Sequence, residues 1–486
     1  MCDFKGRTVE ELLKEYPPCQ LPEQKNALRR ALASFSGTVV VLDDDPTGTQ
    51  TVFDVPVVTD WGVELLEEEL QKKPRMLFVL TNSRALTAVQ SEALHHELAQ
   101  NLLAASQKCG QEILLISRSD STLRGHFPLE TQTLRQELEA WDHRPVDGEI
   151  ICPFFLEGGR FTAGNIHYLV DGGWLKPVGE SEFASDKTFG YHHSHLGKWI
   201  EEKTGGAYRE EDVLYITLED LREQEPSAIR DKLSRVHDFG KIVVNAVSYE
   251  DLERFVPELL WAIQSGKRYI LRTASSILRV LAGCEEGKIL SREELVDREN
   301  SRGGIVLVGS HVRKTTQQLK CLLENSAAQP IEFNQHLVLD HEAFEEEIRR
   351  VSCAADERIR QGQTVVVFTR RERLDLNVAD KEAELRLATA ISDGIIQIIS
   401  GLNVRPNFII AKGGITSSDV ATKGLCIRRA SVMGQILPGI PVWRAGPESK
   451  FPGMPYVIFP GNVGSESSLL EAVEKLRPDA PEDTGK

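Results

Sequence analysis

The sequence has few cysteines, and their positions follow no pattern. The eight cysteines stand far apart, with no CxxC and no other spacing typical of zinc ligands or of a disulfide framework. We therefore expect reduced thiols. No apolar stretch reaches the length that crosses a bilayer, and residues 1–18 alternate charged and apolar positions where a secretory signal would have a continuous apolar core. These absences favour a cytoplasmic protein without a membrane partner.

Positive charge is also in short supply. The chain has 57 lysines and arginines against 73 aspartates and glutamates, which gives a formal net charge of -16. A surface of that sign repels polyanions, so we expect no nucleic-acid partner, although a basic pocket can still lie within it. We expect the ligands to be small molecules. The only protein partner that we consider is a second copy of this chain, in a homodimer.

The length and the apolar pattern predict an α/β fold with two domains. With 486 residues, 41% hydrophobic and 27% charged, the chain can form more than one hydrophobic core. Short apolar runs alternate with polar turns and helical stretches, as mostly parallel sheets require. Strands are expected at 38–42, 76–80, 112–117, 148–152, 213–217, 241–245 and 269–272, and in a second set at 304–308, 331–334, 364–369 and 407–412.

We expect a helical appendage over residues 1–36, a first domain over 37–300 and a second domain over 301–486. Each domain should contain a mostly parallel sheet flanked by helices. The boundary is placed in the charged segment SREELVDRENSRGG, after the first set of strands. We expect an active site in the cleft between the domains.

Three consecutive carboxylates, Asp43, Asp44 and Asp45, follow the apolar run TVVVL. Three carboxylates at one strand end repel one another. The presence of such a costly cluster indicates that it has a function, such as holding a metal, moving a proton or binding a hydroxylated ligand. The alternative is an Asp-rich turn that caps the next helix. We take Asp44 and Asp45 as candidate catalytic residues.

Two further strand ends carry polar clusters, TNSR at 81–84 and RSDSTLRGH at 118–126. We expect all three clusters to converge. The guanidinium groups of Arg84, Arg118 and Arg124 suit a carboxylate, whereas Asp, Ser and Thr side chains suit sugar hydroxyls. Arginines more often form surface ion pairs, but the shared position of these three at strand ends favours a site for an acid sugar.

The loop PFFLEGGRFT at 153–162 follows another expected strand and leads to Asn165 and His167, so it could close over a ligand. His192, His193 and His195 lie in a polar loop, where a solvated cluster is more usual than a metal site. We therefore assign no metal ligands.

Three small-residue turns follow apolar runs in the second domain, at 309–310, 413–419 and 460–466. Such turns let backbone N–H groups face a phosphate, and glycine removes the Cβ that would block its approach. Ordinary turns are the alternative. None of the three is a GxxxxGKS/T loop or a GxGxxG fingerprint, which excludes a standard P-loop or Rossmann site.

Together these motifs resemble those of the four-carbon acid sugar kinases, over most of the chain. Asp44, Asp45, Thr47 and Gly48 match the family's Asp-Asp-x-Thr-Gly motif, and residues 120–125 match its Asp-Ser-Thr-x-Arg-Gly motif. The family's GRxT loop and its Gly-Ser, GGxT and GNxG loops match residues 159–162, 309–310, 413–416 and 461–464. The chain has Arg118 where the family has lysine, and Pro46 where the family has an apolar residue.

The resemblance implies that the second domain binds ATP and that the first holds a sugar acid such as a threonate, an erythronate or an oxo-tetronate. With the arginine clusters, it assigns substrate binding to Thr47, Gly48, Arg84, Arg118, Asp120, Ser121, Thr122, Arg124, Gly159 and Arg160. It assigns ATP binding to Ser310, Gly413, Gly414, Ile415, Thr416, Gly461 and Asn462.

The implied reaction is transfer of a phosphoryl group to a terminal hydroxyl, with Asp44 or Asp45 accepting the proton or helping to hold Mg²⁺. Two alternatives stay open. Asp43, Asp45 and Thr47 also spell the Asp-x-Asp-x-Thr motif of a haloacid-dehalogenase-type phosphatase, although the later paired-carboxylate motif of that mechanism is absent. A non-catalytic nucleotide or metabolite sensor would use domain closure as its output.

Overall fold

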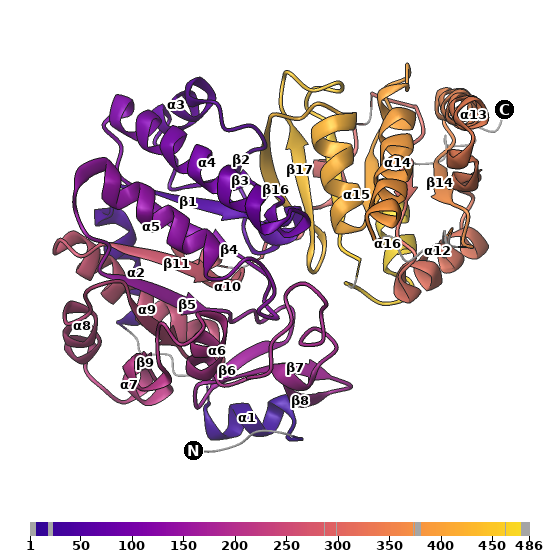
Figure 1. The fold of residues 1–486 in the computed structure, drawn as a ribbon. Coiled ribbons are helices and arrows are strands. Elements are labelled where there is room, and N and C mark those ends of the chain that lie inside the picture. The colour runs from indigo at the N-terminus through magenta and orange to yellow at the C-terminus, as the bar shows by residue number, and fades with distance from the viewer. Residues whose placement is uncertain are drawn as a thin grey trace. The chain divides into compact units, whose positions relative to one another are not determined.

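The computed structural model describes residues 6–17, 23–285, 287–297, 299–372, 374, 381–461 and 463–477. The chain forms two compact units, Met1–Glu286 and Gly287–Lys486 (Figure 1). This division comes before the boundary expected after residue 300. The segment that follows it packs within the second unit: the amide of Leu290 donates to the Gln435 carbonyl at 2.8 Å, and Leu290 lies in that unit's core.

The first unit is built on an eight-stranded sheet in which all pairs are parallel. The strand order is β2-β3-β1-β4-β11-β5-β10-β9. The strands are β1 (Thr38–Asp43), β2 (Val55–Val58), β3 (Met76–Leu80), β4 (Ile113–Arg118), β5 (Gly148–Cys152), β9 (Leu214–Ile216), β10 (Gly240–Val244) and β11 (Tyr269–Thr273). Strands β1, β3 and β4 are buried almost throughout, because helices cover both faces of a parallel sheet.

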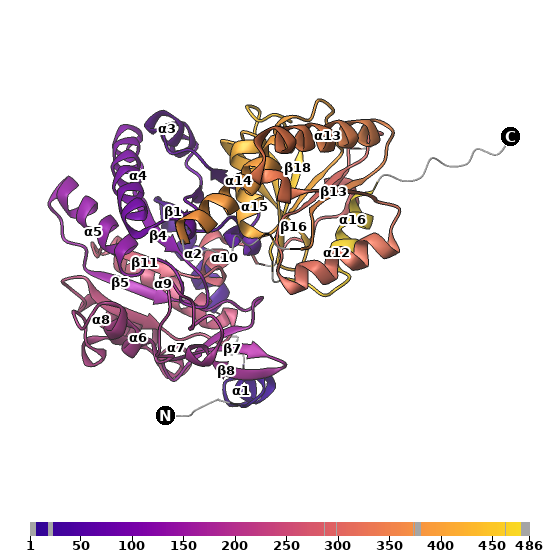
Figure 2. The same cartoon turned by 45° about the vertical axis from the view of Figure 1, so that its right-hand side comes forward.

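Helices α3 (Val63–Gln71), α4 (Ala88–Cys109) and α5 (Leu129–Asp142) cover one face of this sheet (Figures 1 and 2). Their leucines form a continuous core with Val40, Leu42, Leu77 and Val79. On the other face lies α9 (Tyr249–Gln264), which packs against α2 (Gln24–Ser34), α8 (Pro226–Ser234) and α10 (Ser276–Ala282). The expected N-terminal helices are thus α1 (Val9–Glu15) and α2, and α2 belongs to the helical layer of this unit.

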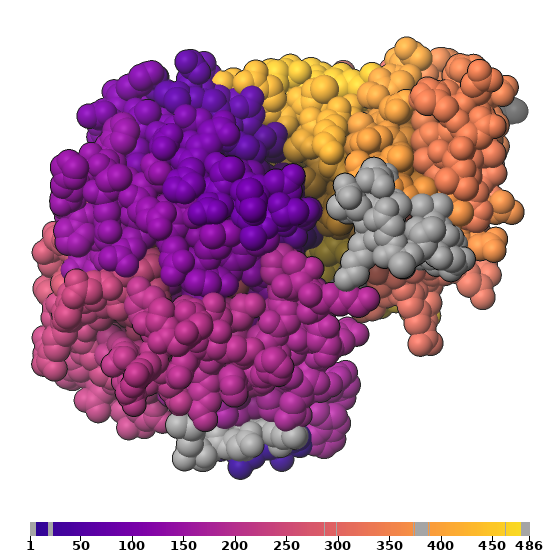
Figure 3. Space-filling view, in the orientation of Figure 1, coloured from indigo at the N-terminus to yellow at the C-terminus, as the bar shows by residue number. Residues whose placement is uncertain are grey.

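A three-stranded antiparallel sheet follows β5, where the sequence predicted a loop. Its strands are β6 (Arg160–Ala163), β7 (Ile166–Asp171) and β8 (Trp174–Pro177). It shares a separate core with α6 (Leu196–Lys203). In the space-filling view, the magenta surface of this region adjoins the purple surface of the preceding segments without a break (Figure 3).

The second unit has a seven-stranded sheet in the order β13-β14-β12-β15-β18-β17-β16. Five strands are parallel: β12 (Ile305–Val308), β13 (Gln329–Phe333), β14 (Val365–Thr369), β15 (Ile409–Lys412) and β18 (Pro455–Phe459). The other two, β16 (Arg429–Leu437) and β17 (Ile440–Ala445), pair antiparallel and were not predicted. The expected α/β class with two mostly parallel sheets is confirmed.

Helices cover both faces of the second sheet as well (Figure 2). Helices α12 (Arg313–Asn325) and α16 (Ser468–Leu476) pack on one face, and α13 (His341–Arg360) and α14 (Lys381–Ser400) pack together on the other. Within the described part of the chain, no helix combines the length and the apolar character needed to cross a bilayer.

Candidate active site

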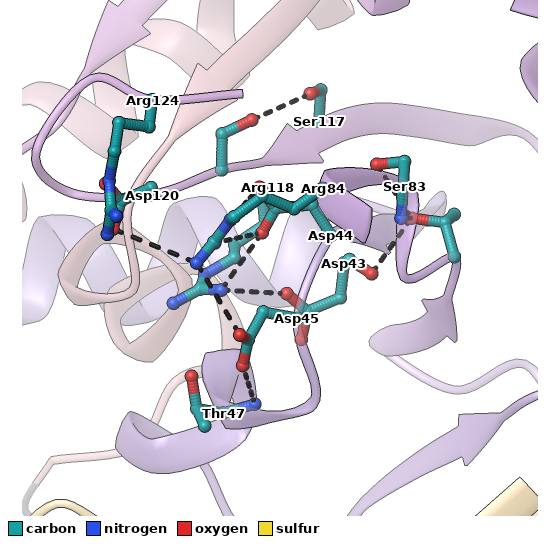
Figure 4. Close-up of polar contacts among 12 residues, drawn as sticks. Asp43, Asp44, Asp45, Thr47, Ser83, Arg84, Ser117, Arg118, Asp120 and Arg124 are labelled. Carbon is teal, nitrogen blue, oxygen red and sulfur yellow. Dashed lines mark hydrogen bonds and ion pairs between the residues drawn. The ribbon is translucent and has the colours of Figure 1, made fainter. Parts of the chain in front are cut away.

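The carboxyl ends of three neighbouring strands carry the polar clusters of the first unit. Asp43 of β1 lies opposite Leu80 of β3 and opposite Arg118 of β4 in the parallel register. The segments that follow these strands therefore meet at one edge of the sheet, and their side chains point toward one another (Figure 4). The three clusters converge as the sequence predicted.

Arg84 lies at the centre of this group. Its Nε is 3.0 Å from Asp44 Oδ2 and its Nη2 is 2.5 Å from Asp44 Oδ1, so one guanidinium binds one carboxylate at two points. Its Nη1 lies 3.5 Å from Asp45 and 4.0 Å from Asp120. The sequence predicts that the Arg84 guanidinium binds a ligand carboxylate, but in the structure it binds the carboxylate of Asp44.

Arg118 lies deeper than Arg84 and is almost fully buried. Its Nη1 is 3.1 Å from Asp43 Oδ1 and 3.4 Å from Asp44 Oδ1, and its Nη2 donates to Ser275 Oγ at 3.4 Å. Two arginines therefore neutralise the carboxylates at the end of β1, which explains how three adjacent aspartates can be held there.

The backbone after the aspartates is shaped around them. The Thr47 amide donates to Asp45 Oδ1 at 2.9 Å, which caps the 3-10 helix η1 (Pro46–Thr51). Gly48 is buried, and a Cβ at this position would overlap the carboxylate of Asp43. The helix-cap interpretation therefore applies to Asp45, whereas Gly48 is needed for close packing on Asp43.

The three carboxylates differ in their acidity. Burial raises the pKa of Asp43 to about 7, against the opposing effect of Arg118. Burial also raises the pKa of Asp44 above its ordinary value despite Arg84 and Arg118. Burial acts in the same direction on Asp45, but the two arginines and the Thr47 hydrogen bond outweigh it and lower the pKa of Asp45. Asp45 is also the most exposed of the three, with 21% of its side chain accessible against 2% for Asp44.

The loop after β4 brings a second acidic side chain and a second arginine to the site. Asp120 accepts from Arg124 Nε at 2.8 Å and from the Thr122 hydroxyl. Burial opposes this, but Arg84 and Arg124 hold the pKa of Asp120 well below its ordinary value. Arg124 Nη1 also lies 3.7 Å from Asp186.

Arg160, at the start of β6, approaches the same place from the antiparallel sheet. Its guanidinium and that of Arg124 both lie over the ring of Phe183, at 6.0 Å and 4.8 Å from the ring centroid. Burial and the positive charge of Arg124 lower the pKa of Arg160. Among the residues that the structure describes, Arg160 forms no ion pair, and its Nε has no hydrogen-bond partner. Gly159, which precedes it, has a positive φ of 68° in the turn that leads into β6.

Several buried groups that the sequence did not single out hold these loops. Glu130 accepts from Ser83 Oγ at 2.6 Å and from Ser117 Oγ at 3.0 Å, which joins the ends of β3 and β4. Arg272, at the end of β11, donates to the Arg124 carbonyl at 3.2 Å. Arg272 is a charged residue directly after the apolar run YIL, which is the signal that could have identified it, whereas Glu130 lies in a polar helical stretch without such a signal.

His167, noted in the sequence beyond the GRxT loop, also supports the Asp120 loop. Its Nε2 lies 2.8 Å from the Ser121 carbonyl and its Nδ1 lies 2.9 Å from Thr162 Oγ1. Burial lowers the pKa of His167 to about 4, so the imidazole is neutral at neutral pH. The Thr122 carbonyl accepts from the Tyr191 hydroxyl at 2.6 Å. Ser121 and Thr122 are thus anchored through their backbone.

In the second unit, parallel register again aligns the predicted loops. Val308 of β12 lies opposite Lys412 of β15 and Phe368 of β14, and Lys412 lies opposite Phe459 of β18. The turns after β12, β15 and β18 therefore leave the sheet at one edge.

Two of these turns touch each other. A Cβ on Gly309 would lie 3.0 Å from Thr416 Oγ1, and a Cβ on Gly413 would lie 3.5 Å from Ser310 Cβ. Gly413 also has a φ of +113°, which favours glycine. Gly414 begins the short helix α15 (Gly414–Asp419), on which Ile415 is 67% exposed.

The third turn is tethered to α12. Gln318 Nε2 donates to the carbonyls of Val463 at 3.1 Å and Ser465 at 2.7 Å. A Cβ on Gly461 would meet nothing within 4 Å, so the backbone there is open to a ligand. Asn462 lies outside the described residues.

Lys412, which sequence reasoning did not assign, is buried between the second and third turns. Its Nζ donates to the Pro460 carbonyl at 2.6 Å and to the Gly461 carbonyl at 3.3 Å. Burial and the nearby charge of Lys314 lower the pKa of Lys412 to about 7. A lysine at the end of an apolar strand was the available signal.

No group of three or more His, Cys, Asp or Glu side chains is arranged to hold a metal ion in the described parts of the chain. At the Asp43–Asp45 cluster, the carboxylates are bound by arginines instead. The histidines of the polar loop lie apart from it, with His192 paired to Glu202 at 2.8 Å and His195 facing Glu210 at 3.4 Å.

Comparison with known proteins assigns each unit a class. Residues 39–281 match a sugar-binding N-terminal domain, and residues 305–469 match a nucleotide-binding C-terminal domain. The fold and the matched domains thus define a protein with a sugar-binding part and a nucleotide-binding part. The chain belongs to the four-carbon acid sugar kinase family, as the motifs indicated.

Two solved structures share the fold. A Salmonella typhimurium LT2 protein named as a candidate tRNA synthase is 16% identical, covers 90% of this chain and 98% of its own, and superposes with a TM-score of 0.63. A Haemophilus influenzae protein of the DUF1537 family is also 16% identical, covers 90% of this chain and all of its own, and has a TM-score of 0.60. Among curated proteins, none matches the chain.

Proposed function

We propose that this protein is an ATP-dependent kinase that phosphorylates a hydroxyl group of a small acid sugar with about four carbons, such as a threonate, an erythronate or an oxo-tetronate. The observation that carries the proposal is the cluster of Asp44, Asp45, Arg84, Asp120 and Arg124 at the strand ends of a sugar-binding domain, in a chain that also has a nucleotide-binding domain. This combination provides donors, acceptors and both charges for an acid sugar.

The carboxylate of the substrate is bound by Arg124 and Arg160. Arg84 is less suited, because its fork already binds Asp44 at two points. Arg160 has no carboxylate partner among the described residues, and it shares the face of Phe183 with Arg124. Two adjacent guanidinium groups with unused donors match the two oxygens of a carboxylate.

Asp45 accepts the proton of the attacking hydroxyl. It is the accessible member of the cluster, and its lowered pKa keeps it ionised at neutral pH. A kinase needs such a base close to the hydroxyl, together with in-line alignment and charge neutralisation at the phosphates. Asp44 is a positioning residue, because both of its oxygens are bound by Arg84.

The turns of the second unit bind ATP. Gly309, Gly413 and Gly461 let phosphates approach the backbone, and Lys412 fixes the loop that contains Gly461. In-line transfer requires the γ-phosphate of the bound ATP to reach the hydroxyl of the bound sugar. Mg²⁺ enters as part of the Mg-ATP substrate, since the Asp43–Asp45 carboxylates are bound by arginines and do not fit a resident cation site.

The burial of Asp43 disfavours the phosphatase alternative. A haloacid-dehalogenase-type phosphatase would need Asp43 as its nucleophile. Asp43 is 1% exposed, is ion-paired to Arg118 and is packed against Gly48. It cannot reach a phosphate ester without dismantling this packing.

ADP release tests the proposal directly. The purified protein is given Mg-ATP and a panel of four-carbon sugar acids, and ADP is measured by a coupled assay. ADP formation that depends on one acid supports the kinase and identifies its substrate. Release of inorganic phosphate from a phosphorylated acid without ATP would instead favour a phosphatase, and ATP binding without turnover on any acid would favour a sensor.

A further inference from the structure

Arg371 is a half-buried cation at the edge of the nucleotide-binding domain where the glycine turns lie. It follows β14, whose Phe368 is opposite Val308 of β12. Its Nη2 donates to the Ser310 carbonyl and to Thr316 Oγ1, both at 2.7 Å. Arg371 therefore holds the Gly309–Ser310 turn against the first turns of α12.

The remaining donors of this guanidinium are unused by the described residues. Arg371 Nε and Nη1 are screened from solvent and have no hydrogen-bond partner in the part of the chain that the structure describes. No ion pair to Arg371 is formed among the residues that the structure describes, and burial lowers its pKa. Buried donors of a charged group are costly to leave unsatisfied, so their retention beside a ligand-binding turn indicates that an anion completes the site.

Positive charge accumulates on both sides of the same turn. Lys412, whose register partner is Val308, has only backbone carbonyls as hydrogen-bond acceptors within the described residues. Lys314, in the first turn of α12, is close enough to influence Lys412 electrostatically. The turn that contains Ser310 is thus bordered by cations.

We propose that Arg371 binds a phosphate group of the nucleotide, with Lys412 and Lys314 contributing charge to the same phosphate site. The inference rests on the proposed ATP site and adds to it a residue that no motif identified. A guanidinium whose Nη2 is already fixed by Ser310 and Thr316 is pre-oriented, so its other donors can bind phosphate with little loss of side-chain entropy.

The test compares ligands that differ in phosphate content. Isothermal titration calorimetry measures the affinity of the full chain for Mg-ATP and for adenosine, in the wild type and in the variants Arg371→Gln and Arg371→Lys. The matched control is Arg370→Gln, because Arg370 is the adjacent residue and lies on the surface facing Glu332 at 3.9 Å. We expect Arg371→Gln to weaken Mg-ATP binding by about 10- to 100-fold while adenosine binding stays within about 2-fold.

Arg371→Lys keeps a positive charge and should fall between the wild type and Arg371→Gln for Mg-ATP, and it provides the comparison if Arg371→Gln fails to fold. Arg370→Gln should bind both ligands as the wild type does. Equal losses for Mg-ATP and adenosine would assign Arg371 a purely structural role, and unchanged Mg-ATP binding would also overturn the inference. A wild type that binds neither ligand would instead refute the proposed nucleotide site.

Discussion

Arg84 and Asp44 form a two-point ion pair between the ends of two neighbouring strands, with Nε to Oδ2 at 3.0 Å and Nη2 to Oδ1 at 2.5 Å. The pair joins the segment after β3 to the segment after β1. Because Arg84 also faces Asp45 and Asp120, it joins its own cluster to both of the others.

Removing one member of this pair should cost more stability than removing both. Arg84→Gln leaves Asp44 buried with Arg118 as its remaining cation and should lower the free energy of unfolding by on the order of 3 kcal/mol. The double variant Asp44→Asn with Arg84→Gln removes the uncompensated charge and should regain part of that loss. Urea unfolding of the wild type, both single variants and the double variant measures the coupling. If the loss of unfolding free energy in the double variant equals the sum of the losses in the two single variants, Asp44 and Arg84 are not coupled.

Asp43 should make stability depend on pH. Its pKa is about 7 in the folded chain and lower when exposed, so between about pH 4 and pH 7 the folded state holds a proton that the unfolded state has lost. Stability from this group is therefore greatest below about pH 4 and is lost as the pH rises to 7. Relative to the wild type, Asp43→Asn should gain stability across this window, by on the order of a few kcal/mol. If the difference in unfolding free energy between the wild type and Asp43→Asn does not change with pH, the pKa of Asp43 is not raised in the folded chain.

The sequence predicted the strand ends correctly because a parallel sheet aligns them. Once β1, β3 and β4 are adjacent, Asp43, Arg84 and Arg118 must lie near one another. Which groups pair is not predictable in the same way: Arg84 and Arg118 were taken as ligand clamps, yet they bind Asp44 and Asp43. That choice depends on side-chain geometry and burial, which apolar periodicity does not contain.

The three antiparallel strands of the first unit were missed for a related reason. Strands β6, β7 and β8 are short and are separated by glycine turns, such as Gly172–Gly173, so their apolar runs are too brief to identify. Their contribution to the site, the position of Arg160 beside Arg124, arises from tertiary packing against Phe183. Lys412 was overlooked because its role comes from the Pro460 and Gly461 carbonyls of a distant strand end.

Arg160 should select acidic substrates. Arg160→Gln removes a guanidinium with unused donors, and we expect the KM for a sugar acid to rise by about 10- to 100-fold while the KM for ATP is unchanged. For a neutral polyol of the same length, the substitution should raise the KM much less, since the polyol has no carboxylate to bind. Steady-state kinetics with both substrates measures the difference. Arg209→Gln, on the surface beside Glu211, serves as control. A similar loss for acid and polyol would rule out carboxylate binding by Arg160.

Asp45 should carry the proton transfer. Asp45→Asn keeps the size of the side chain and its acceptor for the Thr47 amide but removes the basic oxygen, so we expect kcat to fall by about 10²- to 10⁴-fold with ATP affinity unchanged. The pKa of Asp45 lies below its ordinary value, so this base should stay ionised in the wild type down to about pH 4.

Asp44→Asn provides the comparison that separates a base from a residue that positions one. It releases Arg84 from its two-point contact, and turnover should be nearly abolished while ATP still binds, but part of the activity should return in the double variant Asp44→Asn with Arg84→Gln. No second substitution should rescue Asp45→Asn, because a missing base cannot be repositioned. If Asp45→Asn keeps wild-type turnover while Asp44→Asn does not, the proton acceptor is Asp44 and not the more exposed Asp45.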